Sequence, residues 1–184
     1  SLSDDGSIVA IGAYGDDSNG TDTGNVRIFQ GDITPPTVSS VTSSTADGFY
    51  EIEDAIFISV NFSETVYIDP LSSGSTYIQL ETGSIDRLAY YSSGSGSSTL
   101  VFKYNVQSGD SSSDLEYAST SALSLSSRTI KDSAGHNAIL TLPELNSSNS
   151  LAGSSALVID TTAPTISAVT SSTADGTYTV GDSI

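Results

Sequence analysis

The side chains of this sequence that could bind a ligand are mainly carboxylates in expected turns. Ca²⁺ is bound in proteins by about six to eight hard oxygen atoms, several of them from Asp or Glu. Calcium is therefore the cofactor that the residue types indicate. The main candidate ligands are Asp32, Asp47, Asp54, Glu64, Asp132 and Asp160.

These carboxylates cannot all share one ion. Asp54 precedes the expected strand Ala55–Phe62, and Glu64 follows it. A strand of eight residues is roughly 26 Å long, so the two side chains lie too far apart to meet. The alternative for each residue is a solvated turn carboxylate that accepts backbone hydrogen bonds. We expect at most two clusters, which would join Asp32, Asp47 or Asp54 to the domain joint and Glu64 to Asp132 at the far end.

Two other groups are weaker metal candidates. Asp110 and Asp114 lie in a serine-rich stretch that could form an oxygen-rich loop or an ordinary turn. In the N-terminal segment, the Asp-x-Asp-x-Asp-Gly spacing of a calcium loop is broken, because position 21 is Thr and Gly20 comes too early. The residues of that partial match are Asp17, Asn19 and Asp22.

The same residue types give little basis for catalysis. His136 is the single histidine, cysteine is absent, and no serine lies in a Gly-x-Ser-x-Gly turn. Paired carboxylates hydrolyse glycosides only in a cleft with aromatic residues that bind substrate. The nine tyrosines fall mostly on strand positions and the chain has no tryptophan. We therefore expect a protein that is not an enzyme.

Composition narrows the possible partners. The formal charge is −17, with only five Lys or Arg residues. Phosphate backbones are bound by basic patches, so a nucleic-acid partner is not expected. No apolar run approaches the roughly 20 residues that span a bilayer, so membrane insertion is not expected either. Mutual repulsion among the carboxylates would be relieved by bound divalent cations.

Hydrophobic periodicity predicts an all-β chain. In Ala55–Phe62 and again in Leu100–Gln107, apolar residues alternate with polar ones, as in half-buried strands. The loop Ser92–Ser98 reads as a hairpin turn between two strands. Further strands are expected at Ile8–Tyr14, Asn25–Phe29, Val38–Thr42, Val66–Asp69, Tyr77–Glu81, Arg87–Tyr91, Ala138–Leu142 and Leu157–Ile159.

An internal repeat sets the domain organisation. The segment Pro36–Tyr50 returns 128 residues later as Pro164–Tyr178, with 12 of 15 positions identical. Each copy follows an acidic, proline-containing joint, at Asp32–Pro36 and at Asp160–Pro164. A period of this length indicates a tandem array. We expect a partial repeat at 1–31, one module at 32–163 and the start of a second module at 164–184.

Two stretches resemble known families. Residues 1–30 resemble part of an FG-GAP-like repeat of β-propellers, and residues 34–164 resemble the bacterial Ig-like repeats of giant surface and secreted adhesins. The second resemblance rests on ordered elements along the module. These are Thr45-Ala-Asp-Gly48 with Tyr50, Phe62-Ser-Glu64 with Val66, Ser93-Gly-Ser-Gly96, Gly109-Asp110 with Asp114, and Ile159 to Pro164. Two departures are Glu53, where the second copy has Gly181, and His136, where the family pattern has Asn.

The resemblance implies an immunoglobulin-like Greek-key β-sandwich with an N-terminal hairpin and a C-terminal stub of the next repeat. It also implies an extracellular structural or adhesion module on a bacterial surface, rigidified by calcium and in contact with neighbouring repeats. One alternative is a filament subunit that polymerises with identical subunits by donating a terminal strand to an edge. Another is a carbohydrate-binding module that takes a surface glycan, for which Tyr90 and Tyr91 are the aromatic candidates.

Overall fold

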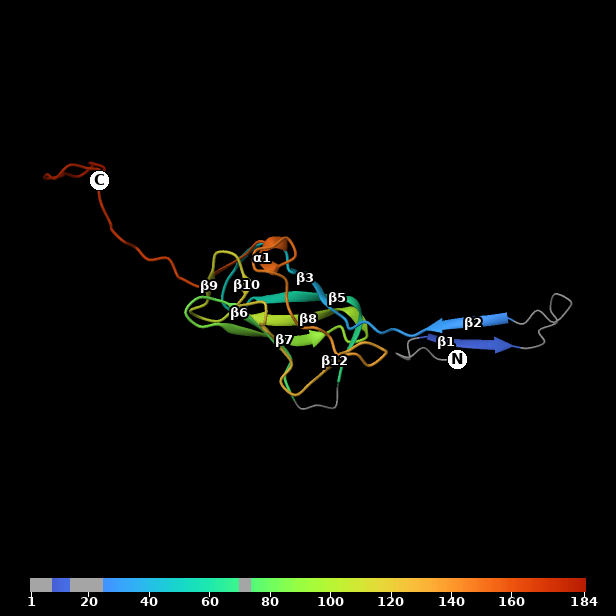
Figure 1. Cartoon of the computed structure of the whole chain (residues 1–184). Helices are drawn as coiled ribbons and strands as arrows, with labels where there is room; N and C mark the ends of the chain where they lie inside the picture. Colours follow the sequence, from blue (N-terminus) through green and yellow to red (C-terminus); the bar gives the residue numbers. More distant parts are fainter. Residues whose placement is uncertain (1–7, 14–24, 70–73) are drawn as a thin grey trace.

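The fold is almost entirely β-structure, arranged along an extended chain (Figure 1). The computed structural model describes residues 8–13, 25–69 and 74–184. A β-hairpin lies at one end, a β-rich domain in the middle, and a chain segment without strands at the other end (Figure 1). The all-β class that hydrophobic alternation predicts is thus confirmed. The immunoglobulin-type Greek-key connection stays a prediction.

The N-terminal hairpin consists of β1 (Ile8–Ala13) and β2 (Asn25–Gln30), as expected from the sequence. The strands pair antiparallel, with Ile8 opposite Gln30 and Ala13 opposite Asn25. A two-stranded sheet of this size buries too little apolar surface to be stable alone. The two strands of the hairpin therefore do not form a hydrophobic core by themselves.

The central domain is built on its two longest strands. β5 (Ala55–Ile68) and β8 (Ser97–Asn105) pair antiparallel, with Ile58 opposite Phe102. Both show the predicted alternation, with apolar side chains buried at every second position. From β8 the sheet continues antiparallel to β7 (Arg87–Ser93) and then β6 (Tyr77–Glu81). β7 and β8 are joined by the tight turn at 94–96, which confirms the predicted hairpin.

Short strands extend this sheet and make it curl. β5 pairs with β3 (Val38–Ser43) along one part and with β12 (Ile130–Lys131) further on. β6 likewise pairs with both β10 (Glu116–Tyr117) and β11 (Leu123–Ser124). Different short strands thus pair with different parts of β5 and β6, and the sheet curls around its apolar face.

A second, smaller sheet covers one end of the domain. β13 (Leu157–Asp160) lies between β4 (Gly48–Tyr50), which runs parallel to it, and β9 (Ser111–Ser112), which runs antiparallel. The short helix α1 (Leu151–Ser154) precedes β13, and the Ser150 hydroxyl accepts a hydrogen bond from the backbone N–H of Gly153. This sheet lies where the chain leaves the domain.

One strand prediction was wrong, and one predicted strand is part of a longer strand. Ala138–Leu142 forms no strand and has one bridge, between Ile139 and Thr37. Val66–Asp69 is not separate, because β5 runs on to Ile68 and Glu64 lies within it. Between Asn61 and Val66 the register against β8 shifts, so the strand bulges at this point. A bulge redirects side chains while the strand continues.

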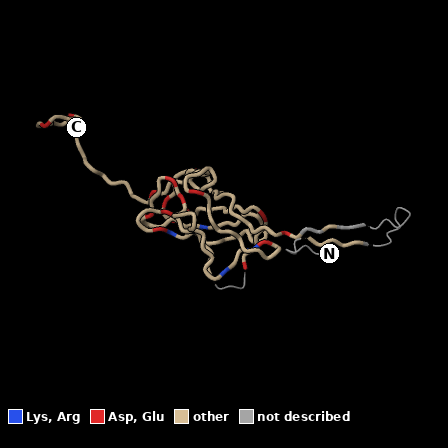
Figure 2. Tube along the Cα trace, in the orientation of Figure 1, with Lys and Arg blue, Asp and Glu red and all other residues tan. Residues whose placement is uncertain are grey.

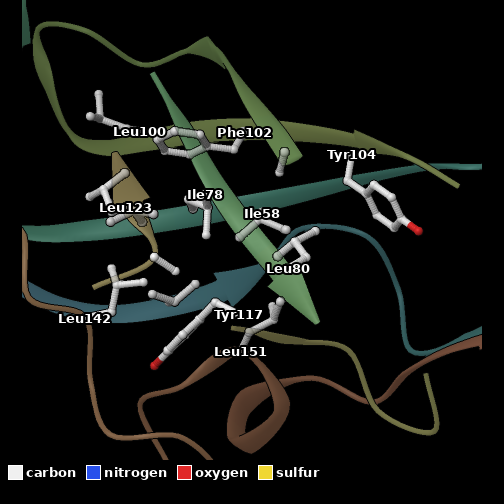
Figure 3. Close-up of a cluster of buried hydrophobic side chains, with 14 of the residues drawn as sticks. Ile58, Ile78, Leu80, Leu100, Phe102, Tyr104, Tyr117, Leu123, Leu142 and Leu151 are labelled. Atoms are coloured by element: carbon white, nitrogen blue, oxygen red, sulfur yellow. The ribbon is translucent and has the colours of Figure 1, made fainter. Parts of the chain in front are cut away.

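The hydrophobic core fills the concave side of the curled sheet. Figure 3 shows Ile58, Phe102 and other side chains of β5, β6 and β8 facing Tyr117 and Leu151. Ile58, Phe102 and Leu151 are fully buried. Tyr117 lies in the core, and its hydroxyl donates a 2.6 Å hydrogen bond to the carbonyl of Pro143. Burial of apolar surface in a single cluster explains why a chain without cysteine folds without disulfides.

Candidate metal site

Three carboxylates from distant parts of the sequence meet beside the bulge of β5. One ligand oxygen from each of Asp32, Glu64 and Asp132 lies within 4.8 Å of the other two. Asp32 belongs to the joint between β2 and β3, Glu64 to the bulge, and Asp132 to the turn after β12. Asp32 is exposed, Glu64 is half-buried and Asp132 is buried. We call this set the joint cluster.

Hydrogen bonds hold the joint against the bulge. The carboxylate of Asp32 accepts hydrogen bonds from the backbone N–H of Thr34 at 3.0 Å and from its hydroxyl at 2.9 Å. This is the local turn that Asp commonly forms with the residue two positions on. Further along, the N–H of Ser63 donates to the carbonyl of Thr37 at 2.8 Å, and the N–H of Thr37 donates to the Ser63 hydroxyl at 3.0 Å. Glu64 is thereby placed next to the joint.

Asp132 is held by the turn that follows it. Its carboxylate accepts a 2.8 Å hydrogen bond from the backbone N–H of His136, and its second oxygen lies 2.8 Å from Nδ1 of the same histidine. The His136 side chain is 34% exposed, whereas the Asp132 side chain is fully buried. His136 thus positions an acid of the cluster.

The electrostatics of the joint cluster differ among its three members. Burial, followed by the charges of Asp32 and Asp132, raises the pKa of Glu64 above its usual value. Hydrogen bonds from Thr34 lower the pKa of Asp32. For Asp132, burial opposes ionisation most strongly, but the hydrogen bonds from His136 and Gly135 outweigh it and lower its pKa. Glu64 therefore resists ionisation, whereas ionisation of Asp32 and Asp132 is favoured.

The donor set suits a hard divalent cation. All three side chains offer oxygen, and among the described residues no Lys or Arg forms an ion pair with them. Ca²⁺ binds oxygen at flexible geometry and would complete its coordination with carbonyl groups or water. Such an ion would supply positive charge where Glu64 now resists ionisation. The ligands would be Asp32, Glu64 and Asp132.

The expected grouping of candidates needs one correction. Glu64 and Asp132 come together as expected, but Asp32 joins them and does not lie with Asp47 or Asp54. The reason is that the joint enters the domain beside the bulge, through the bonds between Thr37 and Ser63. Because Asp32 is close to Asp47 and Asp54 in the sequence, it was expected at the end of the domain opposite to Glu64 and Asp132.

The remaining main candidates accept backbone hydrogen bonds. Asp47 accepts from the N–H of Ala156 at 2.8 Å, and Asp54 accepts from the N–H of Glu51 at 2.9 Å. Asp160 accepts from the N–H of Thr162 at 2.9 Å. Asp54 and Asp160 both line a shallow hollow of about 280 Å³ at the exit from the domain. Within the described part of the chain, no group of three metal-binding side chains forms there.

Of the weaker metal-ligand candidates, only Asp110 and Asp114 lie among the described residues. Asp110 is 1% exposed and is saturated by Arg87 Nε at 2.7 Å, the Tyr104 hydroxyl at 2.6 Å and the N–H of Gln107 at 2.8 Å. Asp114 accepts from the N–H of Leu157 at 3.3 Å. Both therefore support turns of the fold. Asp17, Asn19 and Asp22 lie outside the described residues.

The sequence analysis missed one buried carboxylate. Glu116 is 8% exposed and accepts hydrogen bonds from the N–H groups of Leu151 at 3.1 Å and Asn146 at 3.2 Å. Neither its spacing nor its neighbours in the sequence signal this role, because the partners lie more than 29 residues away. For Asp32 a signal did exist. The pattern Asp-x-Thr recurs at Asp160, and both joints form the same turn.

Comparison of the chain with family models, curated proteins and solved structures found no match. Among the described residues, none of the helical structure has the length and apolar character that crossing a bilayer requires. Figure 2 shows acidic residues in many turns and in the joint at the entrance to the domain, with few basic residues among them.

Proposed function

We propose that the chain is a non-enzymatic structural or adhesion module, one unit of an extracellular array of similar modules on a bacterial surface. The observation that carries this proposal is the recurrence of the joint. Pro36–Tyr50 returns as Pro164–Tyr178 after 128 residues. The hydrogen bond from Thr34 to Asp32 returns as the bond from Thr162 to Asp160. Joints that form the same turn at a fixed spacing suit a protein whose role is to set distance and stiffness.

We also propose that calcium at the joint cluster stiffens the entrance to each module. The three ligands come from the joint, the central strand and a late turn, so one ion would connect segments that the backbone leaves separate. A cation would also offset the repulsion from Asp32 and Asp132 that helps to raise the pKa of Glu64. The raised pKa of Glu64 supports this role, because it marks a place where positive charge is favoured.

Thermal unfolding in excess Ca²⁺ and then in chelator tests the calcium role. A ligand at about 100 times its dissociation constant stabilises the folded state by about 2.7 kcal/mol, which moves the midpoint by several degrees. We expect this shift in the parent chain and its loss in Glu64→Gln and Asp132→Asn. Asp175→Asn, which removes one charge outside the cluster, is the matched control and should keep the shift. An equal midpoint in calcium and chelator would overturn the calcium role.

A filament subunit is a second candidate, supported by the C-terminal segment. Residues 161–184 form no strand, and Ile166 and Val169 are 86% and 91% exposed. Their counterparts 128 positions earlier are Val38 and the fully buried Val41 of β3, which pairs with β5. The segment therefore carries the sequence of a strand that fits an edge of β5, and a second copy offers that edge if its own β3 is displaced.

Sedimentation at increasing concentration separates the two candidates. Strand donation predicts association that Val169→Lys abolishes, because a charge would enter the position that Val41 fills in the core. Val180→Lys is the control, since its counterpart Ile52 is 45% exposed. A monomer at all concentrations would reject the filament candidate and leave the structural module.

A further inference from the structure

Two hollows on the domain share a pair of lining residues. Both are lined by Tyr91 of β7 and by Arg128 in the turn before β12. The larger, of about 360 Å³, is completed by Tyr67, Ile68 and Ser95. The smaller, of about 170 Å³, is completed by Gly74, Ser75, Thr76 and Tyr90. The volume of the larger hollow is in the range of small-ligand pockets. We call the pair the tyrosine pocket.

Arg128 is the basic residue that lines both hollows. Within the described part of the chain, its side chain has neither an ion pair nor a hydrogen bond, and its Nε is buried and unbonded. By contrast, Arg87 is paired with Asp110 at 2.7 Å. In a chain with 22 acidic residues and only five Lys or Arg, an unpaired guanidinium is unexpected. Donors that are buried without acceptors cost free energy, so the pocket favours an acceptor from outside.

A second buried donor belongs to the same pocket. Thr76 is 2% exposed, and its Oγ1 has no hydrogen-bond partner among the described residues. The segment that carries it is packed tightly against the turn of Arg128. A Cβ added at Gly74 would lie 2.5 Å from the backbone nitrogen of Ser127. The segment that carries Thr76 therefore approaches the turn before Arg128 so closely that only glycine fits at position 74.

Tyrosine rings form the walls of the pocket. Tyr67 is 47% exposed and Tyr90 is 51% exposed. The ring of Tyr90 packs edge-on against Tyr77, with centroids 6.2 Å apart. Tyr91 packs edge-on against Phe102, and its hydroxyl accepts a 3.0 Å hydrogen bond from the N–H of Ser95. Rings on paired strands with these contacts are rigid surfaces that a ligand can contact at small entropic cost.

We propose that the tyrosine pocket binds a sugar residue that carries a carboxylate, such as a uronic acid within a glycan. The carboxylate pairs with the guanidinium of Arg128, whose planar fork matches it with two hydrogen bonds. The apolar face of the sugar ring lies on Tyr67 or Tyr90. Its hydroxyl groups exchange hydrogen bonds with the hydroxyls of Ser75, Ser95 and the tyrosines.

A peptide fits this place less well than a sugar. Extended peptides bind by adding a strand to an open sheet edge. Here β7 lies between β6 and β8, and β6 is paired on both sides. The pocket therefore offers side chains and no backbone edge. The surface rich in hydroxyl groups and tyrosine rings favours the sugar, and a peptide carboxylate is left as an outcome of the test.

Isothermal titration of the full chain in chelator tests the proposal, and the chelator removes any contribution from the joint cluster. The probe is a tetrasaccharide with two glucuronic acid residues, and chitotetraose is its neutral counterpart. We expect binding of the acidic probe at least tenfold tighter than that of the neutral one. Arg128→Gln should weaken it at least tenfold and Tyr67→Ala at least fivefold. Lys103→Gln removes the same charge from a side chain that lines neither hollow, and should change affinity less than twofold.

Each other outcome overturns the proposal in a different way. Equal affinity for both tetrasaccharides would show that the pocket does not recognise the carboxylate. Unchanged affinity in Arg128→Gln, in a variant whose unfolding midpoint matches the parent, would place binding elsewhere. Tighter binding of a tripeptide with a free carboxylate would make the ligand a peptide. Equal binding of acetate would reduce the pocket to a simple anion site. Absence of binding at millimolar tetrasaccharide would reject it.

Discussion

At the scale of single residues, Glu53 is held in a backbone conformation that suits glycine. Its φ is 77°, and its counterpart in the second copy is Gly181 at φ 106°. Backbone hydrogen bonds hold Glu53 in this conformation. Its N–H donates to the carbonyl of Val106 at 3.0 Å, and the N–H of Val106 donates to the backbone carbonyl of Asp54 at 2.9 Å. A left-handed conformation costs a residue with a Cβ roughly 1–2 kcal/mol.

We expect Glu53→Gly to stabilise the domain by about 1 kcal/mol, because relief of the left-handed conformation exceeds the extra entropy that glycine loses on folding. The free energy of unfolding in urea measures this. Glu51→Gly removes the same charge where the backbone is not left-handed, and should be neutral or destabilising. Equal effects of the two substitutions would mean that charge, and not backbone conformation, decides the result.

Glu64 makes the stability of the metal-free protein depend on pH. Its pKa is raised in the folded state by burial and by the charges of Asp32 and Asp132. A carboxyl with a raised pKa contributes stability that is complete below its usual pKa of 4.5 and is lost as pH rises through the higher folded value. Asp32 and Asp132 have lowered pKa values and act in the opposite direction, below their usual 3.8.

In chelator we therefore expect Glu64→Gln to remove the loss of stability that the parent shows as pH rises above 4.5. At neutral pH the variant should be more stable than the parent, because a neutral amide avoids repulsion by two carboxylates. Unfolding midpoints measured in steps of pH give the comparison. Glu144→Gln serves as a control outside the cluster. A pH dependence that is the same in parent and Glu64→Gln would contradict this account of the cluster.

At the scale of elements, Asp110 fixes the turn between β8 and β9. It accepts hydrogen bonds from Arg87 on β7, from Tyr104 on β8 and from the N–H of Gln107. Removal of one partner of a buried pair leaves the other charge uncompensated, at about 3–5 kcal/mol. Asp110→Ala should reduce the free energy of unfolding by about this amount. Asp114→Ala loses one 3.3 Å bond and should cost only about 1 kcal/mol. Similar losses for both would reject the network.

Strands were predictable where they are long enough to show a period. β5 and β8 alternate over many residues, so their buried faces follow from the sequence. β9, β10, β11 and β12 have two residues each, and a strand of that length carries no alternation. Their pairing is fixed by tertiary contacts alone. The predicted strand at Ala138–Leu142 was wrong for the converse reason. Its side chains alternate in hydrophobicity, but only Ile139 forms a bridge, to Thr37.

At the scale of the whole molecule, repeats were predictable but the site at the joint was only partly so. The second copy keeps the turn bond from Thr179 to Asp182, at 2.7 Å, which corresponds to the bond from Glu51 to Asp54. This turn is therefore encoded locally and can be read from the sequence. The meeting of Asp32 with Glu64 depends on how the joint enters the domain, which no local pattern contains. The position of the joint relative to β5 is fixed by tertiary packing.

The two joints allow a direct test of calcium stiffening within one chain. Asp32 lies in a cluster with Glu64 and Asp132, whereas Asp160 has no such group among the described residues. We expect Ca²⁺ to raise the heteronuclear NOE of the backbone amides of Gly31 and Ile33, because the ion ties the first joint to β5 and restricts motion on the picosecond to nanosecond scale. The amides of Thr161 and Thr162 at the second joint are the internal control and should not change. Glu64→Gln should abolish the response. Stiffening of both joints alike would assign the effect to general screening of the −17 charge, and an unaltered first joint would leave the carboxylates as turn residues.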